Sequence, residues 1–209
     1  LSYSRPLEIV RGEGRYLIES GGRAYLDCVN NVSHVGHCHP RVVEASIQQM
    51  KALNTNTRYL SGVRLRFAER LLSTLPDELD VLYMVNSGSE ANELAMRLAM
   101  AHTGGEQWVV MDSAYHGNTD SLVSLSPYKF NAAGGSGRSG NVSVATLPDR
   151  YRGRWGYEDS DAGRLYAADV LRCIEEQTCG DKKLAGFFAE SISGCGGQVV
   201  LPDGYLAAA

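Results

Sequence analysis

Asn86-Ser87-Gly88-Ser89-Glu90-Ala91-Asn92-Glu93 is the stretch around which the rest of this chain is organised. A short apolar run, Val81 to Val85, precedes it, and an amphipathic run that ends near His102 follows it. Apolar residues recur in the second run at the spacing of a helix with one buried face: Ala91, Leu94, Ala95, Leu98 and Ala99. The stretch therefore predicts a strand, a tight turn and a helix over residues 90–102.

The turn carries the signature of a helix start. Ser87 is followed three residues later by Glu90, which is the pattern of a capping box. Such a turn directs unpaired backbone N–H groups and the positive end of the helix dipole to one place, which suits a phosphate group. An ordinary serine-capped loop between a strand and a helix fits the same residues equally well, and this stretch alone does not separate the two interpretations.

Strands and helices alternate through the second part of the chain. We expect strands at 81–85, 107–111, 142–147 and 185–189, and helices at 90–102 and 163–179. The strands are continuous apolar runs, which is typical of a parallel sheet covered on both faces. Ligands of such sheets bind at the carboxyl ends of the strands. Those ends carry residues 86–89, residues 112–117 and Glu190.

The N-terminal part has a different pattern. Ser20-Gly21-Gly22 separates two short strand-like runs and predicts a hairpin. Pro40 marks the start of a helix, because its missing N–H costs nothing there. We expect that helix to bury Val43, Ile47 and Met50. A second helix ends before Pro76, and its expected inward residues are Leu65, Ala68, Leu71, Leu72 and Leu75.

Composition excludes several classes of protein. The chain has 209 residues, 44% of them hydrophobic, and a net charge of -4 with a pI near 5.7, so we expect neither nucleic acid nor an anionic membrane as a partner. No apolar run is long enough to span a bilayer. Five cysteines without a CxxC pair favour a reducing, cytoplasmic setting. The first residue is not Met and the last residues resemble a helix interior, so we expect a fragment of a longer protein.

Two apparent motifs do not hold. Residues 135–140 match the GxGxxG pattern, but they precede a strand-like run rather than follow one, so a dinucleotide site is rejected. His34, His37, Cys38 and His39 suggest zinc, but their spacing fits no closed zinc site and neighbouring ligands would crowd one another. We expect no metal, and instead a polar loop that hydrogen-bonds a helix start or lines an active site.

Two strand ends carry residues suited to a ligand. Tyr115 follows the strand at 107–111, where its ring can pack on a planar ligand, and Gly117 nearby allows close approach. A core tyrosine beside a surface histidine is the alternative. Glu190 ends an apolar strand and must be paired or reach a ligand; a structural ion pair is an equally good explanation.

Taken together, these residues resemble the class III, ornithine-aminotransferase-like branch of the pyridoxal-phosphate enzymes. NSGSEANELAMRLA is similar to the phosphate-cup motif of that branch, DSAYHG to its ring-stacking motif, and FFAES to the strand that bears its glutamate. A second set of segments resembles the phospho-lyases that act on phosphoethanolamine and 5-phosphohydroxylysine: CVNNVSHVGHCHP, LNTNTRYL, SPYKF and LPDRYRG. The likeness covers almost the whole chain.

The resemblance implies pyridoxal 5'-phosphate as cofactor and assigns roles to residues of this chain. Gly88 and Ser89 would bind the cofactor phosphate, with Ser87 supporting the turn. Tyr115 would stack on the pyridine ring with His116 beside it. Glu190 would lie near the cofactor and hold an active-site cation or a substrate group. The segment Ser33, His34 and Val35 would help to form the substrate entrance, at the interface of a homodimer.

The resemblance also implies what this stretch does not contain. In the family, the lysine that forms the Schiff base and the aspartate that pairs with the ring nitrogen lie beyond the position of Ala209. The lysines of this chain, none in the Schiff-base context, are Lys51, Lys129, Lys182 and Lys183. We expect a fold-type-I α/β protein without its C-terminal part, with an N-terminal arm and part of the small domain at 1–55 and the incomplete cofactor domain at 56–209.

Three functional hypotheses follow. The first is a phospho-lyase that eliminates phosphate and ammonia from a small phosphorylated amine or amino acid, with Arg58, Lys129 and Arg152 as candidate donors to the substrate phosphate; each could also be a solvated surface charge. The second is a class III ω-aminotransferase with the same cofactor site. The third is a non-catalytic binding module.

Overall fold

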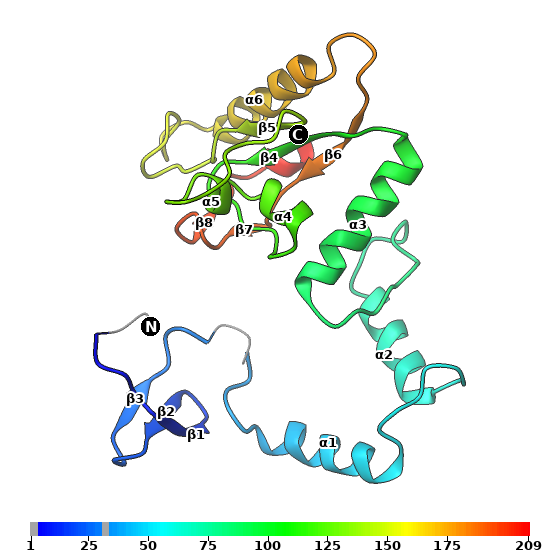
Figure 1. The fold of residues 1–209 in the computed structure, drawn as a ribbon, viewed down its shortest axis with the longest axis vertical. Helices are drawn as coiled ribbons and strands as arrows, with labels where there is room; N and C mark the ends of the chain where they lie inside the picture. The colour runs from blue at the N-terminus through cyan, green and yellow to red at the C-terminus, as the bar shows by residue number, and fades with distance from the viewer. Residues whose placement is uncertain (1–3, 31–33) are drawn as a thin grey trace. The chain divides into compact units, whose positions relative to one another are not determined.

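The computed structural model describes residues 4–30 and 34–209, and the chain divides into two compact units, Leu1–Leu82 and Tyr83–Ala209 (Figure 1). The first unit begins with an antiparallel sheet whose strand order is β1-β2-β3. Its strands are β1 (Ile9–Glu13), β2 (Tyr16–Glu19) and β3 (Ala24–Leu26). The β2–β3 hairpin turns at Gly22, whose φ of 86° is the conformation that glycine adopts without strain. The predicted hairpin is confirmed.

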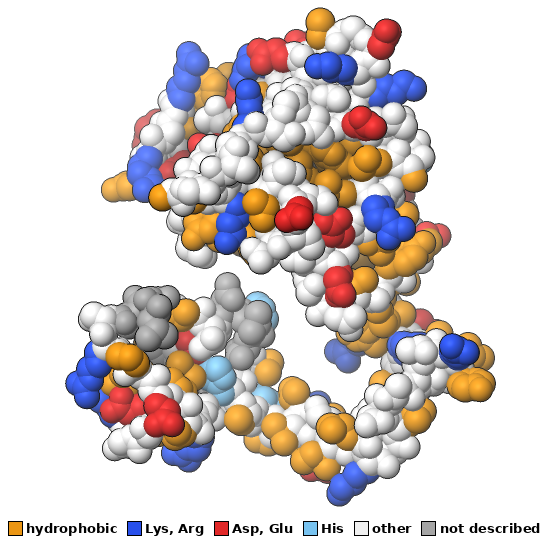
Figure 2. Space-filling model, in the orientation of Figure 1, with side chains coloured by type: hydrophobic (Ala, Val, Ile, Leu, Met, Phe, Trp, Pro, Cys, Tyr) orange, Lys and Arg blue, Asp and Glu red, His pale blue; other side chains and the backbone are white. Residues whose placement is uncertain are grey.

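Two helices complete the first unit. Helix α1 (Pro40–Ala52) starts on Pro40 as predicted, and α2 (Gly62–Leu72) is capped by the Ser61 side chain, which accepts the N–H of Arg64. The expected burial of their apolar faces is wrong for this chain: Met50 is 66% exposed and Leu65 is 52% exposed. Figure 2 shows hydrophobic side chains along the surface of α1. An amphipathic helix buries its face only against a partner, and the described part of the unit supplies none.

The second unit is built on a parallel sheet with strand order β5-β4-β6. Its strands are β4 (Gln107–Met111), β5 (Val142–Ala145) and β6 (Leu184–Phe188). Helix α3 (Gly88–Thr103) precedes β4 in the chain, and helix α6 (Ala162–Gln177) lies between β5 and β6. Shorter elements follow β4 and β6: α4 (Asp120–Ser124), α5 (Pro127–Phe130), β7 (Ile192–Ser193), β8 (Val199–Val200) and α7 (Tyr205–Ala208). The alternation of strands and helices and the parallel pairing agree with the prediction.

The sheet is covered on both faces, as predicted. Alternate residues of β4 enter two separate cores: Val109 and Met111 pack with α6, whereas Trp108 and Val110 pack with α3 and α4. Val109, Val110 and Met111 are fully buried. A strand with buried residues on both faces reads as a continuous apolar run, which explains why the pattern was visible in the sequence.

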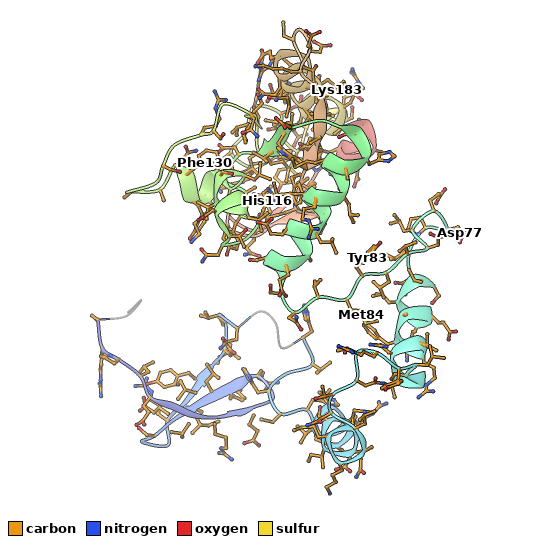
Figure 3. The ribbon with its side chains drawn as sticks, turned by 45° about the vertical axis from the view of Figure 1, so that its right-hand side comes forward. Asp77, Tyr83, Met84, His116, Phe130 and Lys183 are labelled. Carbon is orange, nitrogen blue, oxygen red and sulfur yellow. The ribbon has the colours of Figure 1, made fainter. Side chains whose placement is uncertain are left out.

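Residues 81–85, predicted as a strand, form none. The segment is irregular and largely exposed, with Val81 69% and Tyr83 59% accessible, and Figure 3 draws Tyr83 and Met84 on plain coil. A strand needs a neighbour to accept and donate its backbone hydrogen bonds. No strand among residues 4–30 and 34–209 pairs with this segment. The predicted helix after it is confirmed as α3, which ends at Gly104 in the left-handed conformation.

Candidate active site

The N-terminus of α3 is organised by its own side chains. The Ser87 hydroxyl accepts the backbone N–H of Glu90 at 3.1 Å, and the Glu90 carboxylate accepts the backbone N–H of Asn86 at 2.7 Å. The Ser87 half of the predicted capping box is therefore present, whereas the Glu90 carboxylate holds the N–H of the residue before the N-cap. Within the described ranges, the N–H groups of Gly88 and Ser89 have no hydrogen-bond acceptor. Gly88 is exposed, and a Cβ built on it would meet nothing within 4 Å, so there is open space beside the helix N-terminus, whose positive end favours an anion.

Side chains of α3 tie it to the loop that follows β4. The Ser89 hydroxyl accepts the N–H of Asn118 at 3.1 Å, and the Asn92 amide donates to the carbonyl of His116 at 2.6 Å. The Thr119 hydroxyl donates to the Glu93 carboxylate. Because Ser89 acts as an acceptor here, its own hydroxyl proton remains available to a ligand. These contacts join the first turns of α3 to residues 116–119, the loop that also carries Tyr115.

Gly117 is required where the loop passes α3. Its φ is 147°, and a Cβ at this position would lie 2.8 Å from Ser89 Oγ and 2.5 Å from Leu122 Cδ1. A side chain would therefore separate the loop from the helix N-terminus. The hydrogen-bonding residues that make this junction were not predicted as functional: Asn92, Glu93 and Thr119 through their side chains and Asn118 through its backbone N–H. The first two stand inside the stretch that organises the chain, but their partners are too distant in sequence to be identified from a local pattern.

Glu190 joins two loops at the carboxyl edge of the sheet. It follows β6, and its two carboxylate oxygens accept the backbone N–H of Tyr115 at 2.7 Å and of Gly194 at 2.6 Å. The turn beyond it reaches the other strand ends, since a Cβ on Gly196 would meet Ser113 Cβ at 3.4 Å. The strand ends therefore converge as expected. The partners of Glu190 in this structure are backbone amides rather than a cation.

His116 is buried at the centre of this junction, beside α3 (Figure 3). It is 5% exposed, its ring meets the Phe188 ring edge-on at 5.1 Å, and its backbone N–H donates to the Ser126 hydroxyl at 2.9 Å. Burial lowers the pKa of His116, and the nearby Glu190 charge opposes that shift. The imidazole is therefore neutral at pH 7. Its Nε2 atom has no partner in the part of the chain that the structure describes.

Tyr115 is half-buried and has a basic neighbour. Its ring meets Tyr128 edge-on at 6.1 Å, and the Lys129 ammonium lies 5.4 Å from the centre of the Tyr115 ring. The Tyr128 N–H donates to the Ala114 carbonyl at 3.1 Å, which joins α5 to the loop. Lys129 is thus one of the predicted substrate residues that the structure brings to Tyr115.

Arg152 lies in the loop that follows β5. Its Nε atom donates to the Asp149 carboxylate at 3.1 Å, and one of its terminal nitrogens would be 3.2 Å from a Cβ on Gly197. Burial alone would raise the pKa of the Asp149 carboxyl. The backbone N–H groups of Tyr151 and Arg152 and the Arg152 guanidinium all donate to it, and together they lower its pKa. A cavity of about 340 Å³ lies between this loop and residues 197–203. Arg152 therefore lies near the turn that follows Glu190, but its guanidinium is already paired with Asp149.

The remaining predicted substrate residues belong to the first unit. His34 and Val35 are exposed, as is Arg58, and Ser33 lies outside the described residues. The histidine-rich loop is partly accounted for by a hydrogen bond of 2.6 Å between His37 Nε2 and the Asp27 carboxylate. Over the described residues, no three His, Cys, Asp or Glu side chains gather in a way that could bind a metal, and no helix is long and apolar enough to cross a membrane.

The model of the class III aminotransferases matches residues 2–209. The chain belongs to the class III aminotransferase family. Among curated proteins, it is 46% identical to the alanine–glyoxylate aminotransferase 2-like protein of Drosophila melanogaster, over 98% of this chain and 42% of that protein. It is 40% identical to ethanolamine-phosphate phospho-lyase homolog 1 of Caenorhabditis elegans, over 96% of this chain and 45% of that protein.

Solved structures of the class III family share the fold. A phospholyase from Arthrobacter in complex with phosphoethanolamine aligns with a TM-score of 0.86 and 36% identity, covering 100% of this chain and 48% of that one. An aminotransferase from Vibrio fluvialis aligns with a TM-score of 0.80 at 23% identity, covering 97% and 47%, which supports the fold alone. The chain thus spans less than half the length of these class III relatives.

The predicted fold-type-I architecture and the pyridoxal-phosphate dependence of the class III family are confirmed by these relationships. The residues present fit that cofactor. Gly88 and Ser89 offer amides at an accessible helix N-terminus, which suits a phosphate. Tyr115 offers a half-buried ring, and His116 a buried nitrogen that lacks a partner within the described chain. The role of each residue stays a prediction.

Proposed function

We propose that the full-length protein is a pyridoxal-phosphate-dependent phospho-lyase, which converts a small phosphorylated amine into an aldehyde, phosphate and ammonia. The observation that carries this proposal is the 36% identity, over the whole chain, to a phospholyase solved with phosphoethanolamine. Solved transaminases such as those from Virgibacillus and Thermomicrobium roseum are 23% and 26% identical. Phosphoethanolamine and phosphohydroxylysine are accordingly the substrates of first choice.

Each proposed cofactor role follows from the position of a residue at the carboxyl edge of the sheet or at the N-terminus of α3. Gly88 and Ser89 bind the cofactor phosphate through their backbone N–H groups and the Ser89 hydroxyl, with Ser87 holding the turn. Tyr115 covers one face of the pyridine ring, and His116 lies beside it as a neutral imidazole. When bound, the cofactor supplies an electron sink for the carbon next to the substrate amine. The chain's own part is to bind and orient the cofactor.

Glu190 supports this arrangement through the backbone. Its carboxylate holds the N–H of Tyr115 and the N–H of Gly194, so the ring-bearing loop cannot move independently of β6. We infer that the Schiff-base lysine and the aspartate that pairs with the ring nitrogen are contributed by residues after Ala209. The separate 209-residue chain would then not turn over substrate.

Binding of the substrate completes the proposal. Arg58, Lys129 and Arg152 are the candidate donors to its phosphate, and Ser33, His34 and Val35 the candidate entrance residues, in a cytoplasmic homodimer whose interface forms the pocket. The domain division at residues 55 and 56 belongs to the same proposal. The two contact units divide at a different place, between Leu82 and Tyr83, and do not test it.

A class III ω-aminotransferase is the second candidate, because the Drosophila melanogaster relative at 46% identity carries an aminotransferase name. Two assays on the full-length, cofactor-loaded protein distinguish the candidates. Phosphate release from phosphoethanolamine without any keto-acid acceptor supports the lyase. Amine transfer that depends on an acceptor, with no phosphate released, rejects it. A protein with neither activity and no visible absorbance from bound cofactor would be a non-catalytic binding module.

A further inference from the structure

The backbone of Lys129 is held rigidly. It lies on α5, whose Pro127 is fully buried and whose Phe130 is 3% exposed. The Lys129 N–H donates to the Ser126 carbonyl at 2.8 Å, and the adjacent Tyr128 N–H donates to the Ala114 carbonyl at 3.1 Å. The side chain therefore starts from a fixed position beside the Tyr115 loop.

The Lys129 ammonium lies against two aromatic rings. It is 5.4 Å from the centre of the Tyr115 ring and 5.9 Å from that of Tyr128, within the range of a cation–π interaction. An aromatic ring attracts the positive charge of the ammonium, but it is not a conventional hydrogen-bond acceptor for the three N–H groups. In the part of the chain that is described, the half-buried Lys129 side chain has neither a carboxylate partner nor a hydrogen-bond acceptor.

The carboxylate that holds the Tyr115 loop, Glu190, already has two hydrogen-bond partners. Both oxygens of Glu190 accept backbone N–H groups, from Tyr115 and Gly194. Lys129 is linked to this carboxylate through Tyr115, whose ring it faces and whose backbone N–H the carboxylate holds. The ammonium thus lies against the tyrosine whose loop Glu190 anchors to the strand ends, and its N–H groups have no acceptor among the described residues.

The other candidate donors differ in this respect. The Arg152 guanidinium is paired with Asp149 at 3.1 Å, and Arg58 belongs to the first unit. Partly buried amines are costly unless an acceptor completes their hydrogen bonds. An anion held beside Tyr115 would supply that acceptor.

We propose that Lys129 binds the anionic end of the substrate next to the Tyr115 ring, so that it determines the preference for a phosphorylated amine. This inference rests on the proposed function, because it assumes that the amine end of the substrate reacts at the cofactor. The phosphate of the cofactor is the other possible source of the anion, and it is assigned to the N-terminus of α3.

The test uses the full-length, cofactor-loaded protein and three variants: Lys129→Met, Lys129→Arg and, as a control, Lys183→Met. Lys183 is exposed and precedes β6 at the end of the strand opposite to Glu190 (Figure 3). The change in cofactor absorbance on titration measures the affinity for phosphoethanolamine and for unphosphorylated ethanolamine. Inorganic phosphate is titrated as a competitor of phosphoethanolamine, which requires no turnover.

We expect Lys129→Met to weaken binding of phosphoethanolamine and of inorganic phosphate by roughly ten- to a hundredfold, the value of a hydrogen bond to a charged group. Affinity for ethanolamine and for the cofactor should not change, and Lys129→Arg should retain most of the binding. Lys183→Met should match the parent. Unchanged phosphoethanolamine affinity in Lys129→Met, or an equal loss with ethanolamine, would overturn the inference.

Weakened cofactor binding in Lys129→Met would overturn it as well, because the ammonium would then serve the cofactor phosphate. Failure of the proposed function has a different signature. It appears in the parent protein, as an absence of phosphate release without an acceptor, whereas failure of this inference appears only in the comparison of Lys129→Met with the parent.

Discussion

The Glu190 carboxylate accepts the backbone N–H of Tyr115 at 2.7 Å, although the two residues are 75 positions apart in the sequence. A charged acceptor on a backbone amide makes a strong hydrogen bond. Through its second oxygen, the same side chain holds Gly194 at 2.6 Å. One carboxylate thus determines the geometry of two loops at the carboxyl edge of the sheet, including the loop that carries the proposed ring-stacking tyrosine.

Glu190→Gln should loosen this junction. The amide nitrogen of glutamine cannot accept a hydrogen bond, so one of the two backbone N–H groups loses its partner. We expect a loss of about 1–3 kcal/mol in the free energy of unfolding and weaker cofactor binding in the full-length protein. Urea denaturation and cofactor titration measure the two effects. Glu175→Gln, at an exposed position of α6, is the matched control and should leave both unchanged. Equal behaviour of the two variants would contradict the role assigned to Glu190.

His116 should make stability depend on pH. Burial lowers its pKa in the folded state, so the unfolded chain binds a proton more readily than the folded one. The stability contributed by the neutral His116 is fully present above the ordinary histidine pKa of about 6.5. It is lost as the pH falls from there through the lowered pKa of His116 in the folded state. The free energy of unfolding of the parent should therefore decrease over this interval.

The matched experiment compares His116→Gln with His102→Gln over the same pH range. His102 is exposed at the end of α3, so its variant should keep the parental pH dependence, whereas His116→Gln should lose this component. Identical pH profiles for the parent and His116→Gln would show that the buried imidazole does not govern the effect.

Gly117→Ala tests the contact between the loop and α3. The new Cβ would lie 2.8 Å from Ser89 Oγ and 2.5 Å from Leu122 Cδ1, at a backbone φ of 147°. We expect a destabilisation of about 1–3 kcal/mol from strain and overpacking, with reduced cofactor affinity because Ser89 is displaced. Gly140→Ala is the control, since its Cβ would meet nothing within 4 Å. Urea denaturation measures the free energy of unfolding of both variants. If Gly117→Ala were as stable as Gly140→Ala, the loop at Gly117 would not approach α3 as closely as the structure shows.

Substitutions at Ser87 can distinguish its role as a helix cap from the proposed phosphate site at the same helix end. Ser87→Ala removes the side-chain acceptor for the Glu90 N–H and should cost about 0.5–2 kcal/mol of stability. Ser87→Asp restores a good cap but adds a negative charge beside the proposed phosphate position. The aspartate variant should therefore unfold like the parent and yet bind pyridoxal phosphate more weakly. Normal cofactor affinity in Ser87→Asp would argue against a phosphate at this helix end.

The features predicted correctly from sequence are those that depend on near neighbours along the chain. The cap that Ser87 makes on the Glu90 N–H spans three residues, the apolar stripe of α3 repeats every turn, and the continuous strand at 107–111 records burial on both faces of the sheet. The family motifs lie in the same segments, which is why the cofactor could be predicted as well.

The sequence by itself determined where these elements begin, what type they are and which residues stand at the strand ends. Only the tertiary structure decided that Glu190 holds the Tyr115 backbone, that Asn92 holds His116, and that Lys129 lies over the Tyr115 ring. It also left residues 81–85 without a partner strand among the described residues. The physical reason is the same in each case: such contacts join groups far apart in the chain, and no local pattern specifies which distant donor, acceptor or ring will be brought within reach.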